Sequence, residues 1–79
     1  MRIVELTWRS PRILIAKVDG RDLNITGSES IEGNVHYYIS SRFITRWADG
    51  EPLATDERDS ILREVVAAGR QRGWNFLIE

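Results

Sequence analysis

The C-terminal stretch, residues 55–79, constrains the fold most strongly, because it has the pattern of one amphipathic helix followed at once by a short apolar strand. At about 100° per residue, one helix face is apolar or small and the opposite face is charged. We predict a helix over residues 56–72 and a strand over 75–78. The inward stripe consists of Ile61, Leu62, Val65, Ala68, Gly69 and Arg72. A stripe of this width is suited to lie on a sheet.

Both ends of this helix carry matching signals. Thr55 can cap the first turn through its hydroxyl, and Asp56 and Glu57 place negative charge at the positive end of the helix dipole. Gly73 supplies the left-handed residue that commonly closes a helix. Gly69 lies near the centre of the inward stripe, where it lowers helix propensity by about 1 kcal/mol relative to alanine. We therefore expect it to be a packing glycine that lets helix and sheet approach closely.

The N-terminal part alternates apolar and polar residues, which predicts strands over residues 2–9, 13–18 and 21–26. Asp19-Gly20 separates the second and third of these, and this dipeptide favours a two-residue type I′ turn. In the resulting register Lys17 faces Asp22 and Ala16 faces Leu23. Val18 likewise faces Arg21, and Leu14 faces Ile25. One side of this hairpin is then apolar, and the other carries a pair of opposite charges.

The connection between the first two strands has to be odd in length. A three-residue turn over residues 10–12 sets Trp8 opposite Leu14 and Leu6 opposite Ala16, so the apolar side chains of both strands share a face. A two-residue loop would place them on opposite faces. We predict an odd-length turn with a bulge.

The middle of the chain is less regular. Residues 27–34 are polar and bracketed by glycines, which predicts a surface loop with Ile31 as a lone apolar anchor. Residues 35–47 are rich in aromatic and β-branched types. A single strand of this length would exceed the usual size, so we favour two strands, 35–39 and 42–47. The sequence leaves open whether Ser40-Ser41 forms a hairpin turn.

These segments predict an α+β fold of two layers. We expect a largely antiparallel sheet of five to six strands, with one C-terminal helix packed on one face and a final short strand. The whole chain, residues 1–79, should form a single domain. Because Phe76, Leu77 and Ile78 are all apolar, the last strand should be covered on both faces or lie inside the sheet. The strand order stays open.

The composition offers little for catalysis. The chain has no cysteine and one histidine, His36. Serines lie near His36, but no glycine elbow or oxyanion loop accompanies them, so the pattern is not that of a hydrolase. A single histidine with scattered carboxylates also lacks the close ligand spacing of a metal site. We expect a protein that is not an enzyme and has no cofactor. The first apolar run carries charge and no stretch is long enough to span a bilayer, so a cytoplasmic location is expected.

A binding surface is the remaining possibility. In the two-strand prediction Tyr38, Ile44 and Arg46 share the outward parity, and this mixture of Tyr, Arg and aliphatic residues is favoured in binding hot spots. The predicted partner-binding residues are Tyr38, Ile44, Arg46, Trp47 and Asp49.

From Tyr37 onward the chain resembles a family of small bacterial proteins. The matching features are Tyr38, the segment Phe43-Ile44-Thr45-Arg46-Trp47, Pro52, the acidic cap Thr55-Asp56-Glu57, the apolar helix residues Ile61, Leu62, Val65 and Val66, and the closing Phe76-Leu77-Ile78-Glu79. Together they are similar to the polymorphic-toxin immunity proteins of the family numbered seventy-four. The resemblance implies a protein without catalytic activity that binds a cognate toxin domain and blocks it.

Two other functions stay open. A small domain of this kind can self-associate as a scaffold, or form a homodimer, through an exposed sheet edge or the outer aromatic face. Alternatively, Tyr37, Tyr38 and Trp47, with the nearby Arg42 and Arg46, could stack the bases of a single-stranded nucleic acid. The net charge of −1 argues against nucleic acid as a partner.

Overall fold

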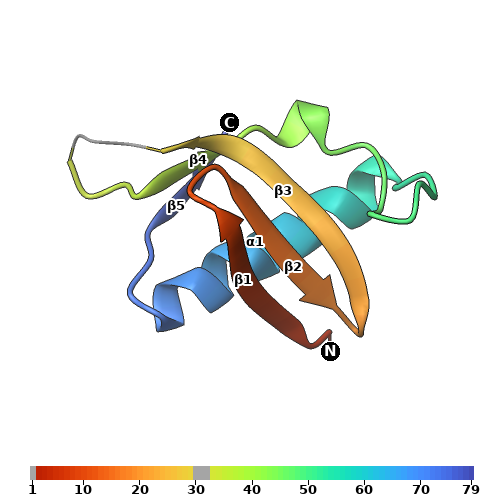
Figure 1. The fold of residues 1–79 in the computed structure, drawn as a ribbon, viewed down its shortest axis with the longest axis horizontal. Coiled ribbons are helices and arrows are strands. Elements are labelled where there is room, and N and C mark those ends of the chain that lie inside the picture. Colours follow the sequence, from red (N-terminus) through yellow and green to blue (C-terminus); the bar gives the residue numbers. More distant parts are fainter. Residues whose placement is uncertain (1, 30–32) are drawn as a thin grey trace.

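The structure, a computed structural model, describes residues 2–29 and 33–79 and has the predicted α+β fold (Figure 1). Along the chain the elements are β1 (Val4–Ser10), β2 (Ile13–Val18), β3 (Arg21–Glu29), β4 (Tyr37–Ile39), the 3₁₀ helix η1 (Ser41–Phe43), α1 (Thr55–Gln71) and β5 (Phe76–Ile78). The strands form one five-stranded sheet in the order β1-β2-β3-β4-β5. All neighbours are antiparallel except β4 and β5, which are parallel.

The two N-terminal hairpins have the predicted registers. Trp8 pairs with Leu14 and Leu6 with Ala16, as predicted, and the register shifts between Trp8 and Ser10, which is a bulge. The predicted three-residue turn over residues 10–12 is wrong, because Ser10 pairs with Ile13 and leaves a two-residue turn of Pro11 and Arg12. In the second hairpin Ala16 pairs with Leu23, and the other three predicted pairs also form. Asp19 and Gly20 have φ values of 51° and 82°, as a type I′ turn requires. In the first hairpin the bulge between Trp8 and Ser10, and not an odd-length turn, brings the apolar residues of both strands onto one face.

The predicted helix stripe lies on the sheet. Ile61, Leu62, Val65 and Gly69 are buried against the apolar face of the strands. An ideal Cβ built on Gly69 would lie 2.4 Å from Cε2 of Phe76, which no real contact tolerates. The phenyl ring of Phe76 thus occupies the space that a side chain at position 69 would fill, which confirms the packing role of this glycine.

The helix begins one residue earlier than predicted, and the prediction of Thr55 as the capping residue is wrong. Ala54 occupies the N-cap position in an extended conformation, without a side-chain hydrogen bond. Leu53, directly before it, is buried, and its N–H donates to the Thr45 carbonyl. This anchor fixes where the chain turns into α1, so packing overrides the local capping preference.

The predicted strand over residues 42–47 is absent. After β4 the chain forms η1, and the N–H of Ile44 donates to the Ser41 carbonyl at 3.0 Å. Because this turn interrupts the two-residue alternation, Phe43 is 66% exposed while Ile44 is 2% exposed. The only pairing in this part is an isolated bridge between Arg46 and Pro52. Ser40-Ser41 therefore leads into a 3₁₀ turn and not a hairpin.

The predicted loop over residues 27–34 is partly strand. β3 continues to Glu29, where it pairs with β4 through Gly27 and Ile39, Ser28 and Tyr38, and Glu29 and Tyr37. A Cβ on Gly27 would lie 1.9 Å from the Tyr38 carbonyl oxygen, so the glycine permits close strand packing here. The expected anchor Ile31 falls outside the described residues.

The last strand is neither internal nor covered on both faces, contrary to the prediction. β5 lies at the edge of the sheet, beyond β4 (Figure 1). Phe76 is buried, in a cluster of edge-to-face and tilted aromatic contacts with Trp8, Tyr37 and Trp74. Leu77 and Ile78 are 49% and 38% exposed. With α1 on one face only, the outward side chains of the sheet, such as Thr7 and Asn24, stay exposed.

We predict that Gly69→Ala destabilises the protein by about 1–3 kcal/mol, the usual range for overpacking a core. The gain of about 1 kcal/mol in helix propensity is outweighed because the buried Phe76 ring must move. Urea unfolding measures the difference.

Combining Gly69→Ala with Phe76→Leu provides the control. The smaller side chain makes room for the methyl group, so the double variant should lose less stability than the two single effects summed. A Gly69→Ala variant more stable than the wild type contradicts this packing.

Candidate functional site

The five predicted partner-binding residues do not form one surface. Arg46 and Asp49 are exposed in the segment between η1 and α1. Ile44 and Trp47 are buried, at 2% and 7% exposure, so the expectation that Ile44 lies on the outer face is wrong. Tyr38 is half-buried on the outward side of β4. The two buried side chains belong to the core and are closed to a partner in this structure.

Tyr38 and the exposed pair lie at different ends of the sheet. Tyr38 pairs with Ser28 near the end of β3, whereas the N–H of Ala48 donates to the carbonyl of Asp22 near its beginning. Ser28 and Asp22 are six residues apart, which corresponds to about 20 Å along a strand. Residues 46–52, which we call the 46–52 loop, therefore form the candidate site without Tyr38.

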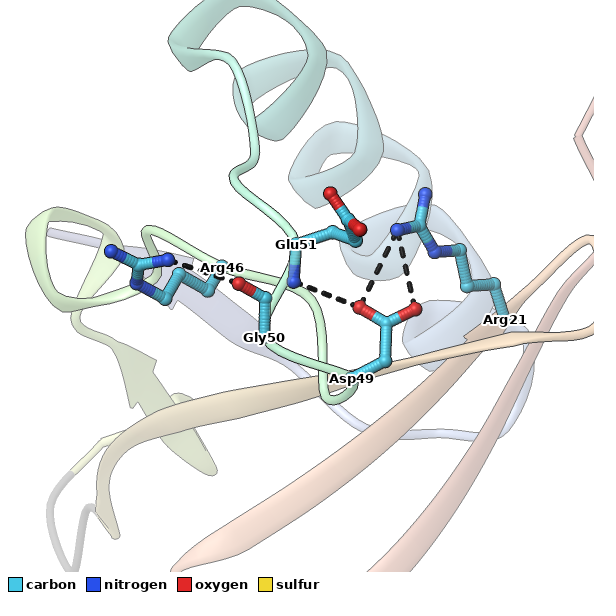
Figure 2. Close-up of polar contacts among 5 residues, drawn as sticks. All are labelled: Arg21, Arg46, Asp49, Gly50 and Glu51. Carbon is cyan, nitrogen blue, oxygen red and sulfur yellow. Dashed lines mark hydrogen bonds and ion pairs between the residues drawn. The ribbon is translucent and has the colours of Figure 1, made fainter.

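Backbone hydrogen bonds hold the 46–52 loop in one conformation. The N–H of Trp47 donates to the Glu51 carbonyl at 2.8 Å, and the N–H of Gly50 donates back to the Trp47 carbonyl at 2.9 Å. Gly50 has a φ of 93°, which glycine adopts without strain. The Arg46 guanidinium closes the turn by donating to the Gly50 carbonyl at 3.0 Å (Figure 2). The loop is thus ordered while its charged side chains remain exposed.

Arg21, at the start of β3, joins this site from a distant part of the sequence. Its guanidinium forms an ion pair with Asp49, with an Nη2 to Oδ2 distance of 3.3 Å (Figure 2). The same guanidinium carbon lies 4.3 Å from the centroid of the Trp47 ring, within cation–π range. Trp47 therefore supports Arg21 from the core instead of meeting a partner itself. Sequence reasoning missed Arg21, because only the folded hairpin brings it to the loop.

The electrostatics of the loop favour the ionised form of Asp49. Its pKa is lowered from 3.8, mainly because its carboxylate accepts a hydrogen bond from the backbone N–H of Glu51, at 2.9 Å. Desolvation acts in the opposite direction, and the charge of Arg21 lowers the pKa further. With Arg46 and Glu51, the site presents charges of both signs in fixed positions (Figure 2). Such a surface suits charge-assisted hydrogen bonds with a complementary partner.

His36 has a structural contact. Its backbone N–H donates to the Asn75 carbonyl at 2.7 Å, and its Nδ1 accepts the N–H of Asn75 at 2.8 Å. The histidine thus holds the chain at the entry to β5. Within residues 2–29 and 33–79, no three His, Asp or Glu side chains are placed to hold a metal ion.

The base-stacking platform considered for nucleic acid does not assemble. Tyr37 is 1% exposed, and its hydroxyl donates to the carbonyl of Arg12 in the turn between β1 and β2. Trp47 is also buried, so of the three aromatic residues only Tyr38 has a partly open face.

No protein-family model, curated protein or solved structure matches the chain. No helix in the described ranges is long and apolar enough to cross a membrane.

We predict that Asp49 stabilises the folded protein in a pH-dependent way. A carboxyl whose pKa is lower in the folded state adds stability above its unfolded pKa, and this stability is lost as the pH falls through the folded value. Asp49→Asn should therefore unfold at a lower temperature than the wild type at pH 7. Below pH 3.8, the ordinary value, the difference should shrink. Melting temperatures measured across this range test the prediction, and a difference independent of pH contradicts it.

Proposed function

We propose that this chain is a binding protein without catalytic activity, and that it neutralises a bacterial toxin domain in the cytoplasm by binding to it. The resemblance of residues 37–79 to immunity proteins suggests the kind of partner. The fold is compatible with this role, because α1 covers one sheet face and leaves the other open (Figure 1).

The order of the 46–52 loop is the observation that carries this proposal. An exposed segment without regular structure usually loses conformational entropy when it binds, and a preformed one loses less. Here four backbone hydrogen bonds of Trp47, Ala48, Gly50 and Leu53, together with the side chains of Arg46 and Asp49, fix the loop before any partner arrives. Arg46 and Asp49 are accordingly the residues that we expect to contact the toxin domain.

Co-expression with the product of the gene immediately upstream tests the function. We expect the upstream product to arrest growth of a bacterial host when expressed alone, and this chain to restore growth. The two purified proteins should form a 1:1 complex in size-exclusion chromatography. Absence of both protection and complex formation contradicts the proposal.

Charge reversal at Arg46 tests the site. Arg46→Glu should weaken the complex at least tenfold, about 1.4 kcal/mol, because loss of an interface arginine commonly has an effect of this size. The matched control is Arg70→Glu, which makes the same charge change at an exposed position near the end of α1. Calorimetric titration of both variants measures the effect, and circular dichroism checks their folding. If both variants bind equally well, the 46–52 loop is not the contact surface.

A further inference from the structure

The two edges of the sheet are protected to different degrees against pairing with a strand of another molecule. At the β1 edge, Nη1 of Arg72 donates to the carbonyl of Leu6 at 2.9 Å, and α1 packs beside the strand. β1 also carries the exposed charges of Glu5 and Arg9. Helical cover and edge charges are the usual means by which proteins prevent edge-to-edge pairing.

The β5 edge is less protected among the described residues: α1 contacts β5 as well as β1, but no residue of the strand is charged. β5 consists of Phe76, Leu77 and Ile78; it packs against β4 and α1, and the Phe76 ring also meets Trp8 of β1. Leu77 and Ile78 are two of the four large apolar residues that are exposed in the described ranges. Leu77 also lies beside Tyr38 on the outward face, because the two residues are register partners.

The hydrogen bonds to β4 show which backbone groups of β5 face outward. The N–H of Glu79 donates to the Ile39 carbonyl, and the Glu79 carbonyl accepts the N–H of Ser41. The backbone N–H and C=O of Asn75 likewise both form hydrogen bonds with His36. Along a strand, the backbone N–H and C=O groups of successive residues point alternately to the two sides. Those of Leu77 therefore also point toward β4, and those of Phe76 and Ile78 point away from the sheet.

We propose that β5 pairs antiparallel with β5 of a second copy of this chain, about a two-fold axis through Leu77. In this register Phe76 faces Ile78 of the partner copy, and each such pair exchanges two N–H···O=C hydrogen bonds. The outward N–H and C=O groups of Phe76 and Ile78 are then hydrogen-bonded on both copies, as the two-fold symmetry of an isologous interface allows. The two sheets join into one continuous sheet across the axis.

The side chains support a second copy as the occupant and this register in particular. Leu77 meets Leu77 of the other copy on the outward face, and Phe76 meets Ile78 on the helix side, so apolar residues pair throughout. Asn75 faces Glu79, which avoids a like-charge pair. A register centred on Glu79 would place two carboxylates opposite each other, and one centred on Ile78 would pair fewer of the free backbone groups.

The interface is small, so the association should be weak. A strand of three residues on each side buries well under the roughly 1,200 Å² of total surface that stable complexes need. The expected behaviour is a dimer that forms reversibly with rising concentration. This inference is independent of the proposed toxin-binding function, because it concerns the β5 edge, whereas the 46–52 loop lies at the opposite end of β3.

Sedimentation equilibrium and disulfide trapping of the whole chain test the proposal. The wild type should shift from monomer toward dimer mass between micromolar and millimolar concentrations. Since the chain has no cysteine, Leu77→Cys introduces a single thiol. The two-fold axis places the two copies of position 77 in a non-hydrogen-bonded pair with Cα atoms about 4.5 Å apart. Mild oxidation should therefore cross-link this variant efficiently.

Glu79→Cys is the matched control on the same segment. Position 79 faces position 75 of the other copy, so the two copies of position 79 are offset by four residues, about 13 Å, beyond the roughly 7 Å that a disulfide can span. Leu77→Lys, a change at a half-exposed side chain, should keep the native circular dichroism spectrum and abolish the dimer. A wild type that stays monomeric at millimolar concentration overturns the proposal. So does cross-linking at Glu79→Cys that equals or exceeds that at Leu77→Cys, or a Leu77→Lys variant that dimerises as well as the wild type.

Discussion

The close contact between Gly69 and the ring of Phe76 sets how closely α1 lies against the sheet. It joins the C-terminal part of α1 to β5, two elements that follow each other in sequence and fold back on each other. Ile61, Leu62 and Val65 extend the same contact along the helix and leave no exposed apolar stripe. Together with the buried Ile44, Trp47 and Leu53 of the preceding segment, α1 covers a single face of the sheet.

This one-sided arrangement determines which surfaces remain available. The outward sheet face, the β5 edge and the 46–52 loop all lie outside the contact between helix and sheet (Figure 1). The loop is connected to the core through Trp47, whose buried ring lies under Arg21. An exposed charged site thus takes its rigidity from a buried aromatic residue. The same side chains therefore contribute to both stability and the proposed binding.

The sequence predicted the elements whose periodicity is continuous. The alternation around Asp19-Gly20 and the stripe from Ile61 to Gly69 each specify one face, so the registers, the helix and the fold class were predicted correctly. The strand predicted after β4 was wrong. Aromatic and β-branched residues favour a strand locally, whereas tertiary contacts make Ser41 to Phe43 a 3₁₀ turn. Such a turn interrupts the alternation of side chains between the two faces of the sheet, so Ile44 was predicted on the outer face although it is buried. The pairing of Arg21 with Asp49 is non-local and leaves no periodic signal.

We propose that the chain binds a protein partner through the 46–52 loop, while α1 only supports the sheet. Backbone amide shifts recorded by NMR while the upstream gene product is added test this most directly. We expect the largest shift changes in residues 46–52 and at Arg21, and little change at the solvent-facing helix positions Arg63 and Arg70. Changes concentrated on the exposed face of α1, with the loop unaffected, would contradict it.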